Sequence, residues 1–330
     1  MTQAQPDVSM PAPAGAVPRE EAGALSRLLT VIGRLARNPA GLIGLIIVTT
    51  YLVLAVIGQW VAPFTFDEQN YSAILQPPST EHLFGTDNFG RDIFSRVVVG
   101  TRSIFVLAFL SSGLGVFLGT VVGLVTGWFG GWIDEILMRL MDVFMSFPSV
   151  LLALLFLPAL EPLMQSGLDQ IGLGDSWLAT QLRIISVIVT IGIVFMPRVA
   201  RVVRSVVLGV KTNEFIDAAR VRGESAHYIM TREILPNASG PIVVEASIRV
   251  SYAILLAATL GYLGLGLEPP SPDWGLQVAQ AQTYILGEPW MLIFPSLAIA
   301  SLVIGVNLLA DGIRSVLDVD DGGPDAGDQQ

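Results

Sequence analysis

Six long runs of apolar residues constrain this chain more than any other feature of its sequence. They lie at roughly 40–62, 103–127, 133–160, 183–208, 240–266 and 289–313. Each reaches about 20 residues, the length an α-helix needs to cross the hydrocarbon core of a bilayer. Lipid offers the backbone no hydrogen bonds, so spanning segments are helices or closed barrels, and runs this long do not suit barrel strands. The sequence therefore predicts an all-α polytopic membrane protein with six transmembrane helices.

The overall composition supports this class. Hydrophobic residues make up 52% and charged residues 14% of the 330 positions, whereas soluble domains carry about a quarter charged residues. The absence of cysteine excludes disulfides and thiolate metal sites. A net charge of −10 argues against nucleic acid as a partner. We expect a disordered N-terminal tail at 1–30 and an acidic, disordered C-terminal tail at 314–330.

Basic residues indicate which loops face the cytoplasm. Seven of the 18 Lys and Arg residues fall in 198–232, and short cytoplasmic loops collect such residues. With six spans, the N- and C-termini then lie in the cytoplasm as well. Four arginines conflict with this topology because it places them outside: Arg91, Arg96, Arg102 and Arg183. We expect the loop 63–102 to hold a short helix of its own and to pair its charges locally.

The hydrophilic segment 211–238 has the pattern of a helical hairpin. Thr212 or Asn213 can cap a helix that begins near Glu214. Phe215, Ala218 and Ala219 fall on one face at helical spacing, and the two small alanines would let that face lie close against another protein.

A glycine turn and a second helix complete this pattern. Gly223 permits a positive φ that a side chain would penalise. Ser225 can cap a second helix that runs to Leu235, and we expect Pro236 to end it. The plainer alternative is an ordinary basic loop that only fixes the topology.

Taken in order, the hairpin resembles the coupling loop of permeases from ATP-binding-cassette (ABC) importers. The matching positions are Asp217, Ala218, Ala219, Gly223, Leu235 and Pro236. The resemblance implies that a separate cytosolic ATPase holds the first helix and moves it. Asp217 stands where the family pattern usually has Glu, which keeps the charge at a shorter reach. No Walker A motif occurs in the chain, so we expect ATP and Mg²⁺ on partner ATPase subunits and no cofactor bound here.

A second segment indicates one branch of that family. Residues 82–103 resemble the extracytoplasmic signature of the second permease of dipeptide, oligopeptide and nickel importers. Its positions are Gly85, Thr86, Asp87, Gly90, Arg91, Asp92, Ser95, Arg96, Gly100 and Arg102. Residues 37–39, 263–275 and 307–318 fit the same branch. The linker 159–182 is longer than this resemblance implies.

The resemblance implies a type I ABC importer permease fold in the cytoplasmic membrane, without catalytic activity of its own. It also implies partners: a second permease, two cytosolic ATPases and an extracytoplasmic binding protein. Di- or oligopeptides are the expected substrate, with nickel and glutathione as alternatives. We expect an N-terminal module at 31–102 with the first span, and a permease core at 103–313 that contains the coupling loop.

Several local features leave alternatives open. The charges of the signature can pair with one another in a self-satisfied loop, or they can form a contact surface for the binding protein or a gate. Trp274 follows a stiff turn rich in proline and can anchor at the membrane interface. Arg139 and Asp142, three residues apart in the third run, favour a mutual ion pair over a substrate contact.

Glycines recur every four residues in the second run. They are Gly115, Gly119, Gly123, Gly127 and Gly131. Such a stripe permits close helix contact, and we favour packing within this subunit over pairing with another subunit.

Proteins of other classes fit less well. An ATP-independent secondary transporter should show internal repeats and intramembrane carboxylates, whereas most Asp and Glu here lie in loops or tails. A membrane scaffold needs no coupling loop. A shared metal site or proton relay is disfavoured because the two histidines, His82 and His227, are expected on opposite sides of the membrane. An intramembrane hydrolase is disfavoured because the sequence contains no Gly-x-Ser-x-Gly or His-Glu-x-x-His motif.

Overall fold

The computed structural model describes residues 38–321 as an α-helical bundle. The longer helices are α2 (Pro39–Val61), α3 (Ile93–Phe129), α4 (Gly131–Ser146), α5 (Ser149–Gln170), α7 (Leu182–Val210), α11 (Ser239–Tyr262) and α13 (Trp290–Asp321). The short elements are η1 (Tyr71–Ala73), α6 (Trp177–Thr180), α8 (Glu214–Val221), α9 (Ala226–Tyr228), η2 (Ile229–Ile234), α10 (Leu235–Asn237), α12 (Trp274–Ala281) and η3 (Gln282–Tyr284). The predicted tail 1–30 and the last part of the acidic tail, 322–330, lie outside the described residues. Up to Asp321 the acidic segment continues α13.

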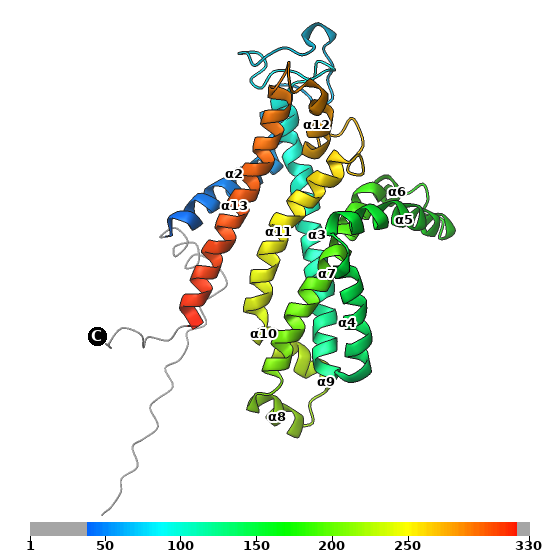
Figure 1. The fold of residues 1–330 in the computed structure, drawn as a ribbon, viewed down its shortest axis with the longest axis vertical. Helices are drawn as coiled ribbons and strands as arrows, with labels where there is room; N and C mark the ends of the chain where they lie inside the picture. Colours follow the sequence, from blue (N-terminus) through cyan, green and yellow to red (C-terminus); the bar gives the residue numbers. More distant parts are fainter. Residues whose placement is uncertain (1–37, 322–330) are drawn as a thin grey trace, which may run out of the picture.

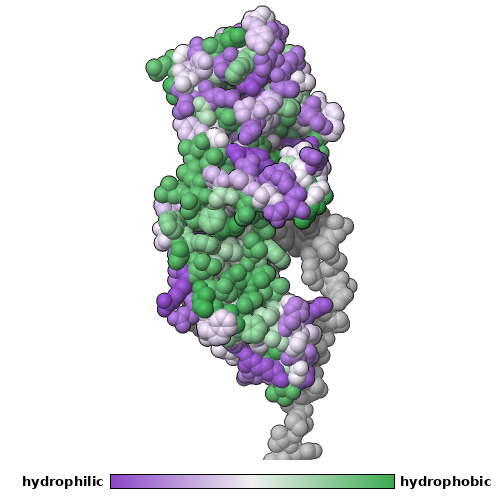
Figure 2. All heavy atoms as spheres, turned by 90° about the vertical axis from the view of Figure 1, so that its right-hand side faces the viewer, coloured by the Kyte–Doolittle hydropathy of each residue, from purple (hydrophilic) through white to green (hydrophobic). Residues whose placement is uncertain are grey.

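Six of these helices are long and apolar enough to cross a membrane, as predicted. They are Pro39–Val61, Ile93–Phe129, Ser149–Gln170, Leu182–Val210, Ser239–Tyr262 and Trp290–Ser315. The second begins ten residues before the predicted 103, because Asp92 caps α3 by accepting a hydrogen bond from the Ser95 N–H at 2.7 Å. Figure 2 shows an apolar belt between two polar ends, which is the surface expected of a membrane-spanning bundle.

The third predicted span, 133–160, is wrong in its bounds because it contains two helices. α4 ends at Ser146, Phe147 is extended (φ −95°, ψ 139°), and α5 starts after Pro148. A residue that precedes proline is disfavoured in the α region, which accounts for the break. Only α5 has the length and hydropathy of a span, and it continues to Gln170 into the linker predicted at 159–182.

The predicted ion pair between Arg139 and Asp142 is also wrong. Arg139 contacts Glu135 at 2.8 Å on the exposed face of α4, while Asp142 accepts a hydrogen bond from Arg201 of α7. Asp134 joins the same two helices through two hydrogen bonds from Arg204, at 2.5 and 2.6 Å. α4 is therefore a charged helix that is bound to α7 by ion pairs, and it is not the start of a transmembrane segment.

The glycine stripe lies where α3 packs against α7 of the same chain. Side chains added at Gly119, Gly123 and Gly127 would lie 2.5–2.7 Å from the Cβ atoms of valines on α7. At Gly115 an added side chain would lie 2.9 Å from the Gly192 carbonyl oxygen. These distances are too short for real contacts, so the glycines allow the two helices to approach closely. Gly131 stands apart, at the start of α4 with open space around it.

The two polar ends of the bundle hold different elements. In Figure 1, α8 and α9 lie at the lower end, whereas the segment 62–92 and α12 lie at the upper end. α3, α7 and α11 run between these ends, and their buried side chains form the main core with α5 and α13. The predicted separation of the hairpin from the signature segment is therefore present in the fold.

Candidate functional site

The hairpin predicted at 211–238 begins with α8, which starts at Glu214 as expected. Asn213 occupies the N-cap position with an extended backbone, but its side chain caps no helix N–H. Thr212 instead donates its hydroxyl to the Gly209 carbonyl at 2.8 Å. Neither predicted cap is therefore formed by a side chain, and α8 is held in place by its packing.

The turn after α8 has the predicted geometry. Gly223 has φ +79°, in the left-handed region that favours glycine. Its N–H donates to the Arg220 carbonyl at 3.0 Å, and the Glu224 N–H donates to the Ala219 carbonyl at 3.2 Å. These bonds satisfy carbonyls at the end of α8 and close the helix. Ser225 then caps the next helix, accepting from the Tyr228 N–H at 3.2 Å.

The second arm of the hairpin does not end at Pro236, contrary to the prediction. It proceeds from α9 through the π-helical turn η2 and α10, and the next helix, α11, begins at Ser239. Pro236 lies in the first turn of α10, where the missing N–H costs little. The hairpin is thus joined to the fifth span by almost continuous helix, with Leu235 half-buried at the junction.

The inner face of α8 packs into a small core at this end of the bundle. Ile216 and Ala219 are fully buried together with Val203 and Val207 of α7 and with Ile229 and Ile234 of the second arm. The prediction that Ala219 faces another protein is therefore wrong, because this alanine allows close packing within the chain. The outer face presents Phe215, Asp217, Ala218 and Val221, of which Val221 is 89% exposed.

Polar contacts tie the hairpin to α3. The Arg220 guanidinium lies 5.0 Å from the centroid of the Trp128 ring, and it also donates a hydrogen bond to Asp217 at 3.0 Å. Lys211 donates its ammonium to the Trp128 carbonyl. No signal in the sequence indicated Trp128, which lies more than 80 residues before the hairpin. α8 thus contacts the ends of two spanning helices, α3 and α7.

At the opposite end, the charged residues of the signature are buried and bonded to one another. Asp87 accepts from the backbone N–H and the Nε of Arg91, at 2.9 and 2.7 Å. Asp92, besides capping α3, contacts Nδ1 of the buried His82 at 3.0 Å. Gly85 and Gly90 have φ of +75° and +71° in turns that a side chain would obstruct. This geometry fits the self-satisfied loop among the alternatives, and η1 is the short helix expected there.

Arg96 joins this loop to the segment before α12. Its guanidinium donates to the carbonyls of Phe66 at 2.9 Å and Ser271 at 3.1 Å. Trp274 is fully buried and donates its indole N–H to the Val97 carbonyl at 2.9 Å. The alternative of Trp274 as an interfacial anchor is therefore wrong. Arg183 also has local partners, Glu161 and the Gly266 carbonyl.

The most distinctive feature at the polar ends of the described structure is the helical hairpin, and not a cluster of residues suited to catalysis or metal binding. Among the side chains described in 38–315, no cluster of three or more His, Asp or Glu residues could hold a metal ion. The hairpin combines an exposed face with a buried face that contacts two membrane helices. This arrangement defines the chain as a polytopic membrane protein with a helical hairpin at one polar end.

Comparisons with known proteins agree with this arrangement. The family model described as "binding-protein-dependent transport system inner membrane component" matches residues 119–319, and that of the "N-terminal TM domain of oligopeptide transport permease C" matches 26–78. The dipeptide transport system permease protein DppC of Alkalihalophilus pseudofirmus is 35% identical over 93% of this chain and 95% of its own length. The glutathione transport system permease protein GsiD of Shigella flexneri is 37% identical over 86% of this chain and 88% of its own.

The fold has a solved counterpart. A chain of the MetNI methionine ABC transporter in an inward-facing crystal form aligns with a TM-score of 0.51 and 22% identity, covering 67% of this chain and 95% of the other. The chain therefore belongs to the inner-membrane permease family of ABC importers, in the branch of the dipeptide and oligopeptide permeases. Membership in this family excludes the secondary transporter and the scaffold considered above.

Proposed function

We propose that this chain pairs with a second permease to form the path by which di- or oligopeptides cross the cytoplasmic membrane. An extracytoplasmic binding protein delivers the peptide, and two cytosolic ATPases supply the energy from ATP and Mg²⁺. The chain itself binds no cofactor and catalyses no reaction. The names of the relatives, most of them dipeptide or peptide permeases, support the substrate class.

The observation that carries the proposal is the two-faced helix α8. Its exposed face, with Phe215, Ala218 and Val221, is available to an ATPase, while Ile216 and Ala219 pack against α7. A force applied to the exposed face therefore reaches α7 through packed side chains and α11 through the nearly continuous second arm. ATP can shift the permease between conformations only if the ATPases bind those conformations with different affinity.

The fold also supports the proposed topology, with the hairpin and both termini in the cytoplasm. Asn38, just before α2, donates its side-chain amide to Ser315 of α13 at 3.3 Å. The start of the first span and the end of the sixth therefore lie on the same side of the bundle. The domain division 31–102 and 103–313, with the buried signature facing the extracytoplasmic side, is part of this proposal.

Crosslinking tests the docking directly, because the chain has no native cysteine. In the assembled complex, Ala218→Cys should form a crosslink with a single cysteine engineered in the ATPase groove, and ATP should change its yield. Ala219→Cys is the matched control, since its side chain is buried and should not react. A hairpin that crosslinks to no ATPase, or that is labelled by an impermeant maleimide from the extracytoplasmic side, contradicts the proposal.

A substitution in the turn tests the coupling itself. Gly223→Val should abolish substrate-stimulated ATP hydrolysis in the reconstituted complex, because a branched residue at φ +79° strains the turn even though open space surrounds it. Gly223→Asn is the control, since asparagine tolerates this conformation. Unchanged stimulation in the valine variant would count against the turn as part of the coupling element.

Glutathione is the second candidate substrate, because a glutathione permease is among the relatives. Nickel is the third candidate substrate for the same architecture. Uptake by proteoliposomes that hold the complete importer, measured with dipeptide, glutathione and nickel in parallel, distinguishes the three. Preference for glutathione or nickel would overturn the peptide assignment while leaving the permease function in place.

A further inference from the structure

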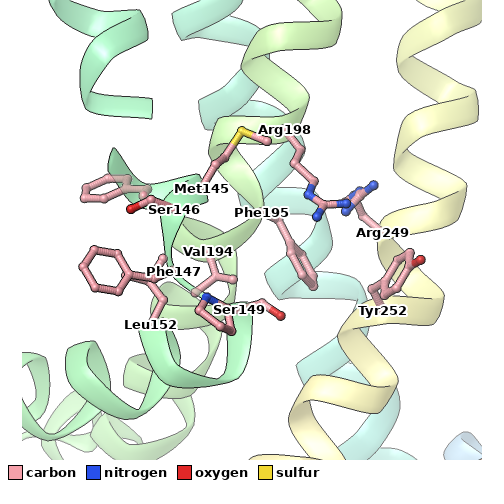
Figure 3. A pocket seen from close by; sticks show the side chains of 12 residues that line it. Met145, Ser146, Phe147, Ser149, Leu152, Val194, Phe195, Arg198, Arg249 and Tyr252 are labelled. Atoms are coloured by element: carbon pink, nitrogen blue, oxygen red, sulfur yellow. The ribbon is translucent and has the colours of Figure 1, made fainter. Parts of the chain in front are cut away.

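A cavity of about 470 Å³ opens between α7, α11 and the junction of α4 with α5. Figure 3 shows its lining, with Arg198 and Arg249 directed toward each other from α7 and α11. Phe195, Tyr252 and Phe144 form apolar walls, and no Asp or Glu lines the cavity. Both arginines lie near the middle of helices that span the membrane, where charged residues are costly and usually have a function.

Arg249 is buried but retains unused hydrogen-bonding capacity. Its Nε lies 2.8 Å from the Glu245 Oε1 one turn earlier. Neither atom makes a hydrogen bond of acceptable geometry to another described residue. The guanidinium also lies 5.7 Å from the Phe195 ring centroid and 5.2 Å from that of Tyr252. Aromatic faces and one carboxylate thus hold Arg249 in place beside the cavity.

Arg198 leaves the local charge unbalanced. Its side chain is exposed, and it forms no ion pair or hydrogen bond with the side chains described in 38–315. Arg201 and Arg204 of the same helix, in contrast, bind Asp142 and Asp134. The cavity region therefore holds two guanidinium groups against the single carboxylate of Glu245. An anion placed between the two arginines would remove this excess positive charge.

We propose that Arg198 and Arg249 form a transient binding site for the carboxylate of the transported substrate. This inference rests on the proposed function, and it names the group that the permease itself recognises. A guanidinium matches a carboxylate through paired hydrogen bonds, and every unmodified peptide carries a C-terminal carboxylate that is ionised at neutral pH. The aromatic walls accept varied side chains, and the volume suits a small peptide.

Substitution of Arg198 gives the first test, because it breaks no ion pair. In proteoliposomes with the complete importer and a saturated binding protein, Arg198→Gln should lower dipeptide uptake about tenfold or more. Arg198→Lys, which keeps the charge without the planar fork, should retain more uptake than Arg198→Gln. Uptake is normalised to the amount of assembled complex. Arg139→Gln is the control, because that arginine is exposed on α4 away from the cavity, and it should transport normally.

Arg249 needs a paired variant, since Arg249→Gln alone would leave Glu245 buried and unpaired. Glu245→Gln combined with Arg249→Gln removes both charges, and this complex should assemble with normal thermal stability yet take up little peptide. If the double variant transports as well as the wild type, Arg249 serves only to neutralise Glu245 and the proposal is overturned.

A change in the substrate tests the carboxylate itself. A dipeptide with a C-terminal amide should be taken up more slowly than the free acid by the wild type, whereas Arg198→Gln should treat the two alike. Retention of the wild-type preference for the free acid in Arg198→Gln would overturn the proposal.

Uptake measured with different substrates distinguishes a failure of the carboxylate site from a failure of the proposed function. If the wild type takes up glutathione rather than dipeptide, and Arg198→Gln lowers that uptake, the peptide assignment fails and the carboxylate site stands. If Arg198→Gln takes up the wild-type substrate at the normal rate, the site fails and the permease function stands.

Discussion

The guanidinium of Arg220 lies 5.0 Å from the centroid of the Trp128 ring, which brings helix α8 against the end of α3. On its other side, α8 packs against α7 through Ile216 and Ala219. The helix is thus held to two spanning helices, by a cation–π contact and by apolar packing. Since α3 and α7 pack along the glycine stripe, displacement of α8 is expected to move them together.

Replacing the tryptophan tests whether this contact contributes to coupling. Trp128→Leu keeps apolar bulk but removes the ring face that Arg220 contacts. An exposed cation–π contact contributes about 0.5–1 kcal/mol, so substrate-stimulated ATP hydrolysis should fall about two- to fivefold. Trp132→Leu is the control, because Trp132 is exposed on α4. Equal stimulation in the two variants would show that the packing against α7 suffices.

The glycine stripe predicts a position-dependent cost within α3. Gly119→Ala would place a Cβ 2.5 Å from the Val199 Cβ, so α3 and α7 must separate, at a cost of about 1–3 kcal/mol. Gly113→Ala meets nothing within 4 Å on the same helix and should be neutral or stabilising, since alanine favours helix over glycine. Thermal unfolding of the purified importer measures both. A similar loss in the two variants would contradict packing as the role of the stripe.

Most of the fold follows from the apolar runs. In lipid, each spanning segment must form its backbone hydrogen bonds within its own helix, whatever its neighbours are. The third run fails for a physical reason visible in the sequence. Asp134, Glu135, Arg139 and Asp142 place four charges in its first ten positions, and Pro148 follows. Those charges make α4 a helix that binds α7 by ion pairs, and the apolar span starts only at Ser149.

Features of the candidate site that depend on the backbone preferences of single residues could be predicted from the sequence. Features that depend on packing between distant segments could not. Gly223 and Ser225 behave as their backbone preferences require. The choice of which alanine is buried depends on Ile229 and Ile234, which belong to the other arm of the hairpin, so helical spacing within α8 does not determine it. The cavity arginines, Arg198 and Arg249, lie 51 residues apart and meet only because α7 and α11 adjoin it.

The ion pair between α4 and α7 should contribute measurably to stability. Arg204 donates two hydrogen bonds to Asp134, whose side chain is 19% exposed. Asp134→Asn removes the charge and should lower the free energy of unfolding by about 1–2 kcal/mol. Glu135→Gln is the matched control, because its pair with Arg139 is exposed and such pairs contribute about 0–1 kcal/mol. Equal thermal stability of the two variants would contradict a stabilising role for the Asp134–Arg204 pair.

The last prediction concerns a buried acid in the segment before α12. Asp273 is 1% exposed and its Oδ1 caps α12 by accepting from the Leu276 N–H at 2.8 Å, while its Oδ2 has no hydrogen-bond partner among the described residues. Burial raises the pKa of Asp273 to about 6 from 3.8, against opposing contributions from the N–H groups of Leu276 and Gly275 and from the charge of Arg96. The folded state therefore keeps a proton that the unfolded chain releases as pH rises from 3.8 to about 6.

The stability that this proton contributes is present below pH 3.8 and is lost as pH rises through about 6. Asp273→Asn keeps a capping side chain without the charge. The variant should therefore gain stability relative to the wild type above pH 6, by roughly 3 kcal/mol at most, and should lose that gain near pH 4. Thermal unfolding of the purified importer at pH 5 and pH 7.5 measures the difference, with the exposed Asp175→Asn as control. A stability difference between Asp273→Asn and the wild type that is the same at both pH values would show that this carboxyl does not titrate in the range.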